Sequence, residues 1–194
     1  MLDVPDGNTP LTPEELADLI PNLATKEQLN EWERENILEA RRWALSDRNV
    51  KTLDPMADET IRKLHRRMFD QTWKWAGKYR QAEKNMGVPV GQMREMLGAL
   101  LGDVRYWIEN NTYSLDEIAI RFHHRLVSIH LFPNGNGRHA RLVADVLAVR
   151  LGRPAFTWGQ QDLIRLGEAR ESYLQVLRTA DNGDINPLLD FARS

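Results

Sequence analysis

The residues best suited to chemistry lie in one short stretch, His130 to Arg141, which reads His-Leu-Phe-Pro-Asn-Gly-Asn-Gly-Arg-His-Ala-Arg. Glycines at positions 135 and 137 allow a tight turn and let an anion approach backbone N–H groups without a Cβ in the way. A helix that follows would begin with N–H groups that lack helical partners, which also favours anions. Arg138 and Arg141 would share one face of that helix. Because His130 is a candidate base near neutral pH, the stretch predicts an anion cradle with a base at its rim.

Helical sequence patterns surround this stretch and would position it. A capping box at Ser114 and Glu117 opens a helix that runs into His130, and a strongly apolar helix follows the motif as far as Gly152. Apolar residues at three- and four-residue steps predict further helices at about 12–21, 26–44, 58–69, 92–109 and 160–180, with a last helical turn near 188–192. No long linker divides the chain. The sequence therefore predicts an all-α bundle around the glycine-rich stretch.

The bulk composition is that of an ordinary globular protein. Of 194 residues, 42% are hydrophobic and 28% are charged, and the absence of cysteine excludes disulfides and thiolate chemistry. No apolar run has the length of a membrane span and no signal-peptide pattern opens the chain, so we expect a cytoplasmic protein without membrane contact. A net charge of −2 argues against a nucleic-acid-binding protein. A homo-oligomer is left open by these properties.

Taken as a whole, the motif resembles the signature of the Fic family, His-x-Phe-x-(Asp/Glu)-Gly-Asn-Gly-Arg-x-x-Arg. The matching residues are His130, Phe132, Gly135, Asn136, Gly137, Arg138 and Arg141. Asn134 departs from the signature, because many members carry an acid there. The likeness extends from about Glu35 to the last long helix and is closest to the bacterial group called mobile mystery protein B. It implies a Fic-type helical bundle with one short β-hairpin, the flap.

The resemblance also implies a protein adenylyltransferase, which moves AMP from ATP to a Ser, Thr or Tyr hydroxyl of a target protein. His130 would be the catalytic base. Backbone N–H groups would bind the α-phosphate, and planar guanidinium groups would bind the β- and γ-phosphates. Asn136 would add a side-chain donor. Mg²⁺ would bridge the phosphates, with Asn134 as a poorer ligand than a carboxylate. The expected nucleotide-binding residues are Asn134, Gly135, Asn136, Gly137, Arg138 and Arg141.

An N-terminal helix at about 26–44 resembles the inhibitory helix of many Fic proteins, whose pattern is Ser/Thr-x-x-x-Glu-Gly/Asn. Glu35 and Asn36 match its last two positions, whereas Glu31 occupies the Ser/Thr position. The resemblance implies that Glu35 pairs with Arg141 and blocks the γ-phosphate, as in a toxin-like regulator that inhibits itself. The acidic first 59 residues and the basic motif segment would then attract each other, although two independently solvated faces explain the charges equally well. We expect 1–57 to form the inhibitory part and 58–194 the Fic core.

The sequence Trp75-Ala-Gly-Lys-Tyr-Arg80 resembles the segment that precedes the flap in Fic proteins. The flap itself would span about 81–90, with Val88-Pro-Val90 as its second strand. An edge strand can align a target segment by adding it to the sheet. The residues expected to dock the target are Asn85, Met86, Gly87 and Val88.

Other interpretations of the motif remain open. A nucleotide-binding Fic module with weak transfer, another nucleotide donor or de-AMPylation would suit the neutral Asn134. A kinase like the Doc branch is disfavoured, because Gly137 stands where that branch has Lys. A metal hydrolase built on His123, His124 and His130 lacks a ligand spacing such as His-Glu-x-x-His. DNA binding is disfavoured because the arginines have a better use at phosphates.

Overall fold

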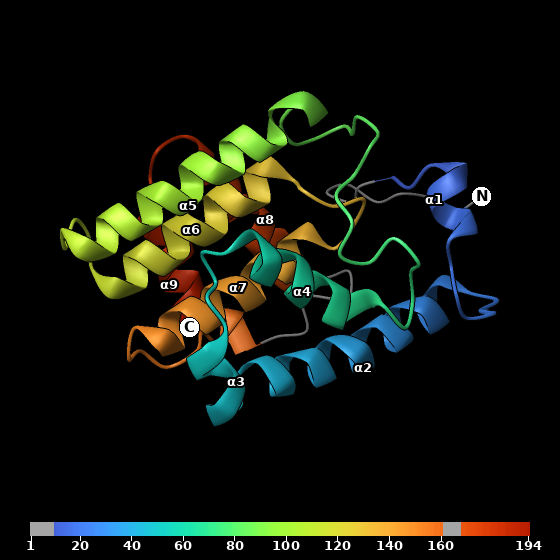
Figure 1. Cartoon of the computed structure of the whole chain (residues 1–194), viewed down its shortest axis with the longest axis horizontal. Helices are drawn as coiled ribbons and strands as arrows, with labels where there is room; N and C mark the ends of the chain where they lie inside the picture. Colours follow the sequence, from blue (N-terminus) through green and yellow to red (C-terminus); the bar gives the residue numbers. More distant parts are fainter. Residues whose placement is uncertain (1–9, 161–167) are drawn as a thin grey trace.

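The computed structural model describes residues 10–160 and 168–194. These residues form a bundle of α-helices without a β-strand, so the all-α prediction is confirmed (Figure 1). None of the described helices has the length and apolarity that crossing a membrane requires. The helices are α1 (Pro13–Ala17), α2 (Lys26–Ala44), α3 (Asp47–Thr52), α4 (Asp58–Phe69), α5 (Met93–Glu109), α6 (Leu115–Ile129), α7 (Asn136–Arg150), α8 (Glu168–Asp181) and α9 (Asn186–Arg193), with 3-10 turns η1 (Val90–Gln92) and η2 (Trp158–Gln160).

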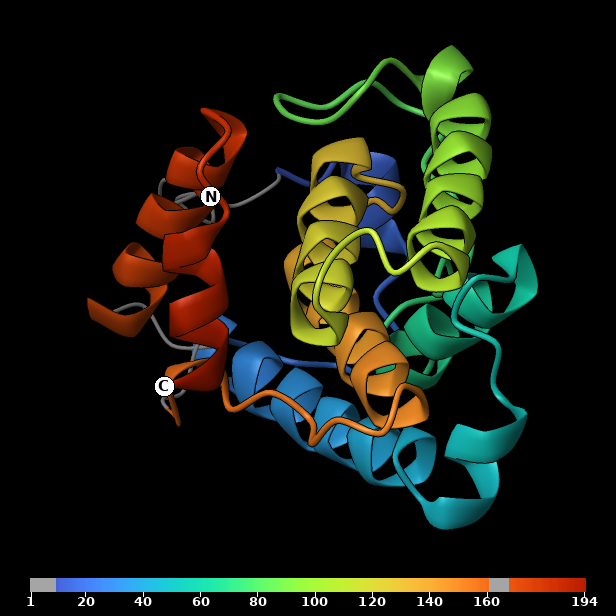
Figure 2. The same cartoon turned by 90° about the vertical axis from the view of Figure 1, so that its left-hand side faces the viewer.

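The centre of the bundle is α7, as its apolar sequence predicts. All its residues from Leu142 to Ala148 are buried, which a helix achieves only when neighbours cover every side. Helices α6, α4 and α3 pack against α7, and α5 and α2 then cover α6 and α4 respectively. Figures 1 and 2 show α7 running through the middle of these elements. The motif therefore opens the most buried of the described helices.

The N-terminal segment packs along the loop that follows α4. The Ile20 N–H donates to the Thr72 carbonyl, and the Lys74 N–H donates to the Asp18 carbonyl, so 18–20 runs antiparallel to 72–74. Figure 1 shows α1 beside this loop, at the opposite end of α2 from α3. The arm before α2 is thus bound to the same loop that leads towards the expected flap.

The local signals at the helix starts are largely confirmed. Thr12 and Thr25 both form reciprocal capping boxes, and Ser114 caps α6. Between the helices expected at 26–44 and 58–69 the structure adds α3, because Ser46 accepts a hydrogen bond from the Asn49 N–H and caps a short helix there.

The C-terminal helices differ from expectation in their bounds. The expected helix at 160–180 corresponds to α8, whose described part begins at Glu168, and residues 161–167 of that prediction lie outside the described residues. The last helical turn expected at 188–192 is part of a full helix, α9, which has Pro187 in its first turn.

Candidate active site

The loop from His130 to Gly135 joins the end of α6 to the start of α7. His130 ends α6 in a left-handed conformation, with φ 59° and ψ 61°, and Gly135 precedes α7 with φ 78°. A Cβ on Gly135 would lie 2.5 Å from the Phe69 ring, so only glycine fits there. Phe132 is fully buried and stacks on His65 with 3.7 Å between ring centroids. The predicted base and the predicted helix N-terminus therefore belong to one anchored loop.

Asn136 closes this loop from within. Its side-chain oxygen accepts from the Phe132 N–H at 2.9 Å, and its amide nitrogen donates to the Phe132 carbonyl at 2.8 Å. The side chain is buried. We had expected it to contact phosphate, but both of its polar ends serve the loop. Its own backbone N–H, in the first turn of α7, remains suited to an anion.

His130 lies in a desolvated and electropositive setting. Burial, followed by the nearby Arg80 and Lys84, lowers the pKa of His130 to about 4. The backbone of Val127 partly offsets this lowering. A neutral imidazole carries one N–H and keeps a lone pair on the other nitrogen. His130 is therefore held in the form that can accept a proton at neutral pH.

Arg80 ties the segment 81–90 to the catalytic loop. Its side chain is fully buried and donates to the carbonyls of Ala82, Val88 and His130. Residues 81–90 contain no β-strand, so the expected hairpin is not formed by strand pairing. A narrow loop instead leads into α5 (Figure 2), and the Val88 N–H donates to the Ile129 carbonyl. We keep the name flap for 81–90.

The flap places the expected docking residues beside the histidine. A Cβ on Gly87 would lie 2.4 Å from the His130 Cβ, and Gly87 has φ 98°, so a side chain is excluded there. Asn85 is exposed, whereas Met86 and Val88 are half-buried. Gly87 thus brings the backbone of 81–90 against the predicted base. The position suits alignment of a hydroxyl over His130, a role that stays a prediction.

The N-terminal helix reaches the motif through Glu33 rather than Glu35. The Glu33 carboxylate lies 2.5 Å from Arg138 and also accepts from the Trp73 indole at 2.8 Å. Glu35 is exposed, and Arg141 contacts Tyr173 instead. The expected pairing of Glu35 with Arg141 is therefore wrong in both partners. Asn36 is half-buried and donates to the Thr72 hydroxyl at 3.4 Å.

Helix geometry explains this correction. Two residues along an α-helix turn the side chain by about 200°, so Glu33 and Glu35 face nearly opposite directions. Leu29, Glu33, Ile37, Ala40 and Ala44 follow at steps of four, four, three and four residues. Such a stripe marks the buried face of a helix. A glutamate inside this apolar stripe indicates Glu33, whereas the inhibitory-helix pattern indicates Glu35.

A second ion pair fixes α2 to α7, with the charges reversed. Arg41 of α2 donates to Asp145 of α7 at 3.2 Å. Asp145 is buried, and burial raises the pKa of its carboxyl despite donors from Phe156 and Trp158 at 3.0 Å each. A cavity of about 100 Å³ lies between the two pairs, with both motif arginines among its lining residues. The arginines thus face a small space that α2 closes.

Arg141 is held by an aromatic network. Its guanidinium carbon lies 4.9 Å from the centre of the Tyr173 ring. Tyr173 in turn lies 2.9 Å from Nε2 of buried His123. Sequence reasoning missed Tyr173, because a single tyrosine in an amphipathic helix looks like a core residue.

The site does not fit a protein-held metal. Asn134 Oδ1 accepts from the Gly135 N–H at 2.6 Å and from Arg138 at 3.2 Å, so a guanidinium already occupies the side of the oxygen that a cation would need. Among the described residues no group of three His, Cys, Asp or Glu side chains could hold a metal. His123 and His124 contact Tyr173 and Asp181, away from His130. The expected metal role of Asn134 is therefore not supported, and neither is the metal-hydrolase alternative.

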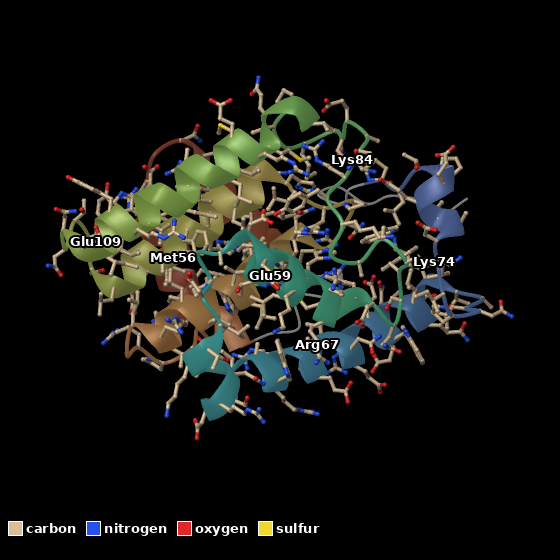
Figure 3. The ribbon with its side chains drawn as sticks, viewed as in Figure 1. Met56, Glu59, Arg67, Lys74, Lys84 and Glu109 are labelled. Atoms are coloured by element: carbon tan, nitrogen blue, oxygen red, sulfur yellow. The ribbon has the colours of Figure 1, made fainter. Side chains whose placement is uncertain are left out.

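Helix α1 covers the flap from the other side. Lys84 of the flap is almost fully buried, with 2% of its side chain exposed, and forms an ion pair with Glu15. It also donates to the Pro10 carbonyl at 2.9 Å, while the Trp75 indole donates to the Glu15 carbonyl at 3.1 Å. Figure 3 shows Lys84 on the loop that faces α1. Two N-terminal elements, α1 and α2, therefore contact the two sides of the candidate site.

Comparison with known proteins agrees with this geometry. Residues 55–148 match the Fic/DOC family. Over 146 residues the chain is 30% identical to the protein adenylyltransferase Fic of Nematostella vectensis, covering 73% of this chain and 33% of that protein. Over 135 residues it is 30% identical to the protein adenylyltransferase Fic of Drosophila grimshawi, covering 68% of this chain and 26% of that protein. The chain thus spans about a third or less of these relatives.

The fold is also found among solved structures. The BepC protein of Bartonella tribocorum, determined with bound AMPPNP, superposes with a TM-score of 0.68 at 16% identity, covering 94% of this chain and 97% of that one. At that identity the likeness concerns the fold alone. Together with the sequence match and the loop that brings His130 to the start of α7, it leads to one conclusion: residues 55–148 are a Fic/DOC family domain, and the chain belongs with the proteins that carry one.

Proposed function

We propose that this protein is an adenylyltransferase that transfers AMP from ATP to a hydroxyl side chain of a target protein. The observation that carries the proposal is the anchored loop 130–135, which holds a neutral imidazole and the N-terminus of α7 together. The names of the two curated relatives and the AMPPNP bound to BepC support a nucleotide substrate of this kind.

The proposed reaction follows from the donors and the base of this loop. The N–H groups at the start of α7 bind the α-phosphate, and Arg138 and Arg141 bind the phosphates beyond it. The target hydroxyl oxygen attacks the α-phosphorus, and His130 accepts its proton. The bond between the α-phosphorus and the bridging oxygen breaks, and pyrophosphate leaves. Catalysis of this type rests on positioning and charge stabilisation.

We further propose that α2 inhibits this activity. Glu33 neutralises Arg138, one of the two groups that would bind the outer phosphates. ATP can bind fully only when the carboxylate leaves, because two anions cannot share one guanidinium in a buried site without strong repulsion. The supporting observations are the burial of Glu33 and its second bond to Trp73.

Several finer features belong to this proposal. Any Mg²⁺ would enter with the phosphates of ATP, because the described residues offer no ligand set for it. We also propose that the protein is cytoplasmic, acts as a toxin-like regulator and belongs to the bacterial mobile mystery protein B group, which agrees with a self-inhibiting helix. The proposal leaves open whether the protein is a monomer or a homo-oligomer. The target protein would dock along the flap.

Labelling with ATP that carries ³²P at the α-phosphate tests the proposal. The native chain, a Glu33→Gly variant and a Glu33→Gly, His130→Ala variant are each incubated with labelled ATP, Mg²⁺ and a bacterial extract. We expect weak protein labelling by the native chain, stronger labelling by Glu33→Gly and none without His130. Absence of label from Glu33→Gly would refute the transfer activity. If ATP still bound, the chain would instead be a nucleotide-binding module. Label only from γ-labelled ATP would indicate a kinase.

A further inference from the structure

Tyr173 lies over the first turn of α7, where the proposed nucleotide would be bound. Its hydroxyl is 3.5 Å from the position that a Cβ would take on Gly137, and its side chain is almost fully buried. The same tyrosine contacts Arg141, one turn further along α7. A single hydroxyl thus sits between an N-terminal residue of the helix and a phosphate-binding arginine. Helix α8, which carries Tyr173, therefore lies beside the start of α7.

The hydrogen-bond partners of this hydroxyl leave its own hydrogen unused. Burial holds the pKa of His123 well below its usual range, so the ring is neutral and carries one N–H. Nδ1 of His123 has no partner among the described residues, whereas Nε2 lies 2.9 Å from the tyrosine oxygen. The N–H is therefore on Nε2, because an unpaired buried N–H is the costlier choice. His123 therefore donates to the tyrosine oxygen, Arg141 lies against the ring, and neither side chain can accept the hydroxyl hydrogen.

The tyrosine remains a hydrogen-bond donor under ordinary conditions. Burial raises the pKa of Tyr173, although Arg141 opposes the shift, so the phenol keeps its hydrogen at neutral pH. The buried hydroxyl hydrogen needs an acceptor, and a phosphate oxygen is one. Its neighbours on α7, a helix N-terminus and a guanidinium, favour the same ligand.

A second residue of α8 supports an anion at this place. Arg170 lies three residues before Tyr173, on the same face of the helix. Burial and the nearby charge of Arg138 lower the pKa of Arg170. Arg138 is paired with Glu33 in this structure, so Arg170 adds positive charge beside the proposed phosphate site.

We propose that Tyr173 is a phosphate-binding residue of the nucleotide site, donating its hydroxyl hydrogen to a phosphate oxygen that Arg141 also contacts. His123 is the positioning residue that orients the hydroxyl. This inference rests on the proposed function only in that a nucleoside triphosphate binds in the cradle. It does not require that AMP be transferred.

Nucleotide binding without turnover tests the inference. The parent is the full chain with Glu33→Gly and His130→Ala, and calorimetry measures its dissociation constants for ATP, ADP and adenosine. Adding Tyr173→Phe removes one oxygen and keeps the ring under Arg141. We expect ATP and ADP binding to weaken roughly tenfold, because a hydrogen bond to a charged group is lost, and adenosine binding to stay unchanged.

Matched variants separate this role from a structural one. Tyr79→Phe also removes a bonded hydroxyl, but that hydroxyl donates to Asp58 at 2.6 Å, so ATP affinity should not change. His123→Gln retains a donor near the Nε2 position and should keep affinity, whereas His123→Leu should lose it, without further loss when combined with Tyr173→Phe.

Three outcomes would overturn the inference. The first is equal ATP affinity of the parent and its Tyr173→Phe derivative. The second is an equal loss of adenosine binding in that derivative. The third is no ATP binding to the parent, which would overturn the proposed function as well. ATP binding that weakens in Tyr173→Phe, in a protein that transfers no label, would refute only the proposed function.

Discussion

Glu33 and Arg138, which are 105 residues apart in sequence, meet with 2.5 Å between carboxylate oxygen and guanidinium nitrogen. Glu33 is 6% exposed, and its other oxygen accepts from Trp73. The pair connects the helix before the Fic/DOC match to the first arginine of the motif. Glu33 is buried and hydrogen-bonded to both Arg138 and Trp73, so the proposed inhibition requires that this contact break before Arg138 binds phosphate.

The first prediction concerns this pair. Glu33→Gly should strengthen ATP binding by at least tenfold, because Arg138 becomes available to phosphate. Glu35→Gly is the matched control: it makes the same change two residues away on an exposed face and should leave the affinity as it is. Calorimetric titration with ATP measures both. Equal behaviour of the two variants would show that Glu33 is not the inhibitory group.

The second prediction concerns Arg80, whose guanidinium joins both ends of the flap to the His130 carbonyl. Arg80→Lys keeps the charge but loses the planar fork that reaches three carbonyls. In a Glu33→Gly background we expect protein labelling to fall at least tenfold while ATP affinity changes little. Labelling and calorimetry on the same samples measure the two effects. A parallel loss of ATP affinity would show that Arg80 supports the cradle rather than the flap.

The third prediction concerns His65 beneath the motif loop. Its Nδ1 accepts from the Gly77 N–H at 3.0 Å and its Nε2 lies 3.1 Å from the Asn134 carbonyl, so one neutral ring bridges two loops. His65→Phe keeps the stacking on Phe132 but leaves both backbone groups unpaired. We expect a loss of roughly 2–4 kcal/mol in the free energy of unfolding. Urea denaturation measures it, and a loss below about 1 kcal/mol would indicate that water replaces the ring.

The fourth prediction is a dependence of stability on pH. Burial lowers the pKa of His139 to about 4, against about 6.5 when unfolded. Between these values the unfolded chain binds the proton more readily, so the unfolding free energy falls as pH falls, by up to about 1.4 kcal/mol per pH unit for this residue. The contribution is complete above pH 6.5 and lost as pH falls through 4.

A variant isolates this contribution from those of other groups, including Asp145, whose raised pKa acts in the opposite sense. His139→Gln keeps a donor for the Ile61 carbonyl, which accepts from His139 Nε2 at 2.8 Å, but does not titrate. Urea denaturation at pH 7, 6 and 5 should give a shallower slope for His139→Gln. The same slope in both proteins would show that His139 does not cause the acid sensitivity.

The fifth prediction concerns the pH profile of transfer. A base with a pKa of about 4 is already deprotonated at pH 5.5, whereas an ordinary histidine with a pKa near 6.5 would be about nine-tenths protonated there. Initial labelling rates of Glu33→Gly should therefore change less than twofold between pH 7 and 5.5. A tenfold fall over that interval would mean that His130 regains an ordinary pKa once α2 is released.

The sequence predicted features that depend on local pattern. The helix cap at Ser114, the apolar face of α5 and the glycine before α7 all follow from spacing along one helix or turn. The place of the base at the end of α6 follows in the same way. Each of these depends on residues within a few positions of one another, which a single sequence displays directly.

Features that depend on contacts between distant segments were less accessible. Whether Glu33 or Glu35 faces α7 depends on how α2 is rotated about its own axis. A small change in the set of residues taken as the buried face of α2 reverses that choice. The side chain of Asn136 could equally bind phosphate or its own loop, and only the position of Phe132 decides. Tyr173 gains its place through α8 folding back over the motif. The flap has no strands, and Arg80 holds it through hydrogen bonds to the carbonyls of Ala82 and Val88.

The stacked pair Trp73 and Trp75 has a practical consequence. Their ring centroids are 5.0 Å apart, and each indole N–H donates to a different N-terminal element, Trp73 to Glu33 of α2 and Trp75 to the backbone of α1. Release of either element would expose one indole to water and alter its fluorescence. The protein thus contains an intrinsic optical reporter, in which a red shift on adding ATP would follow the opening of the site in real time, without any attached dye.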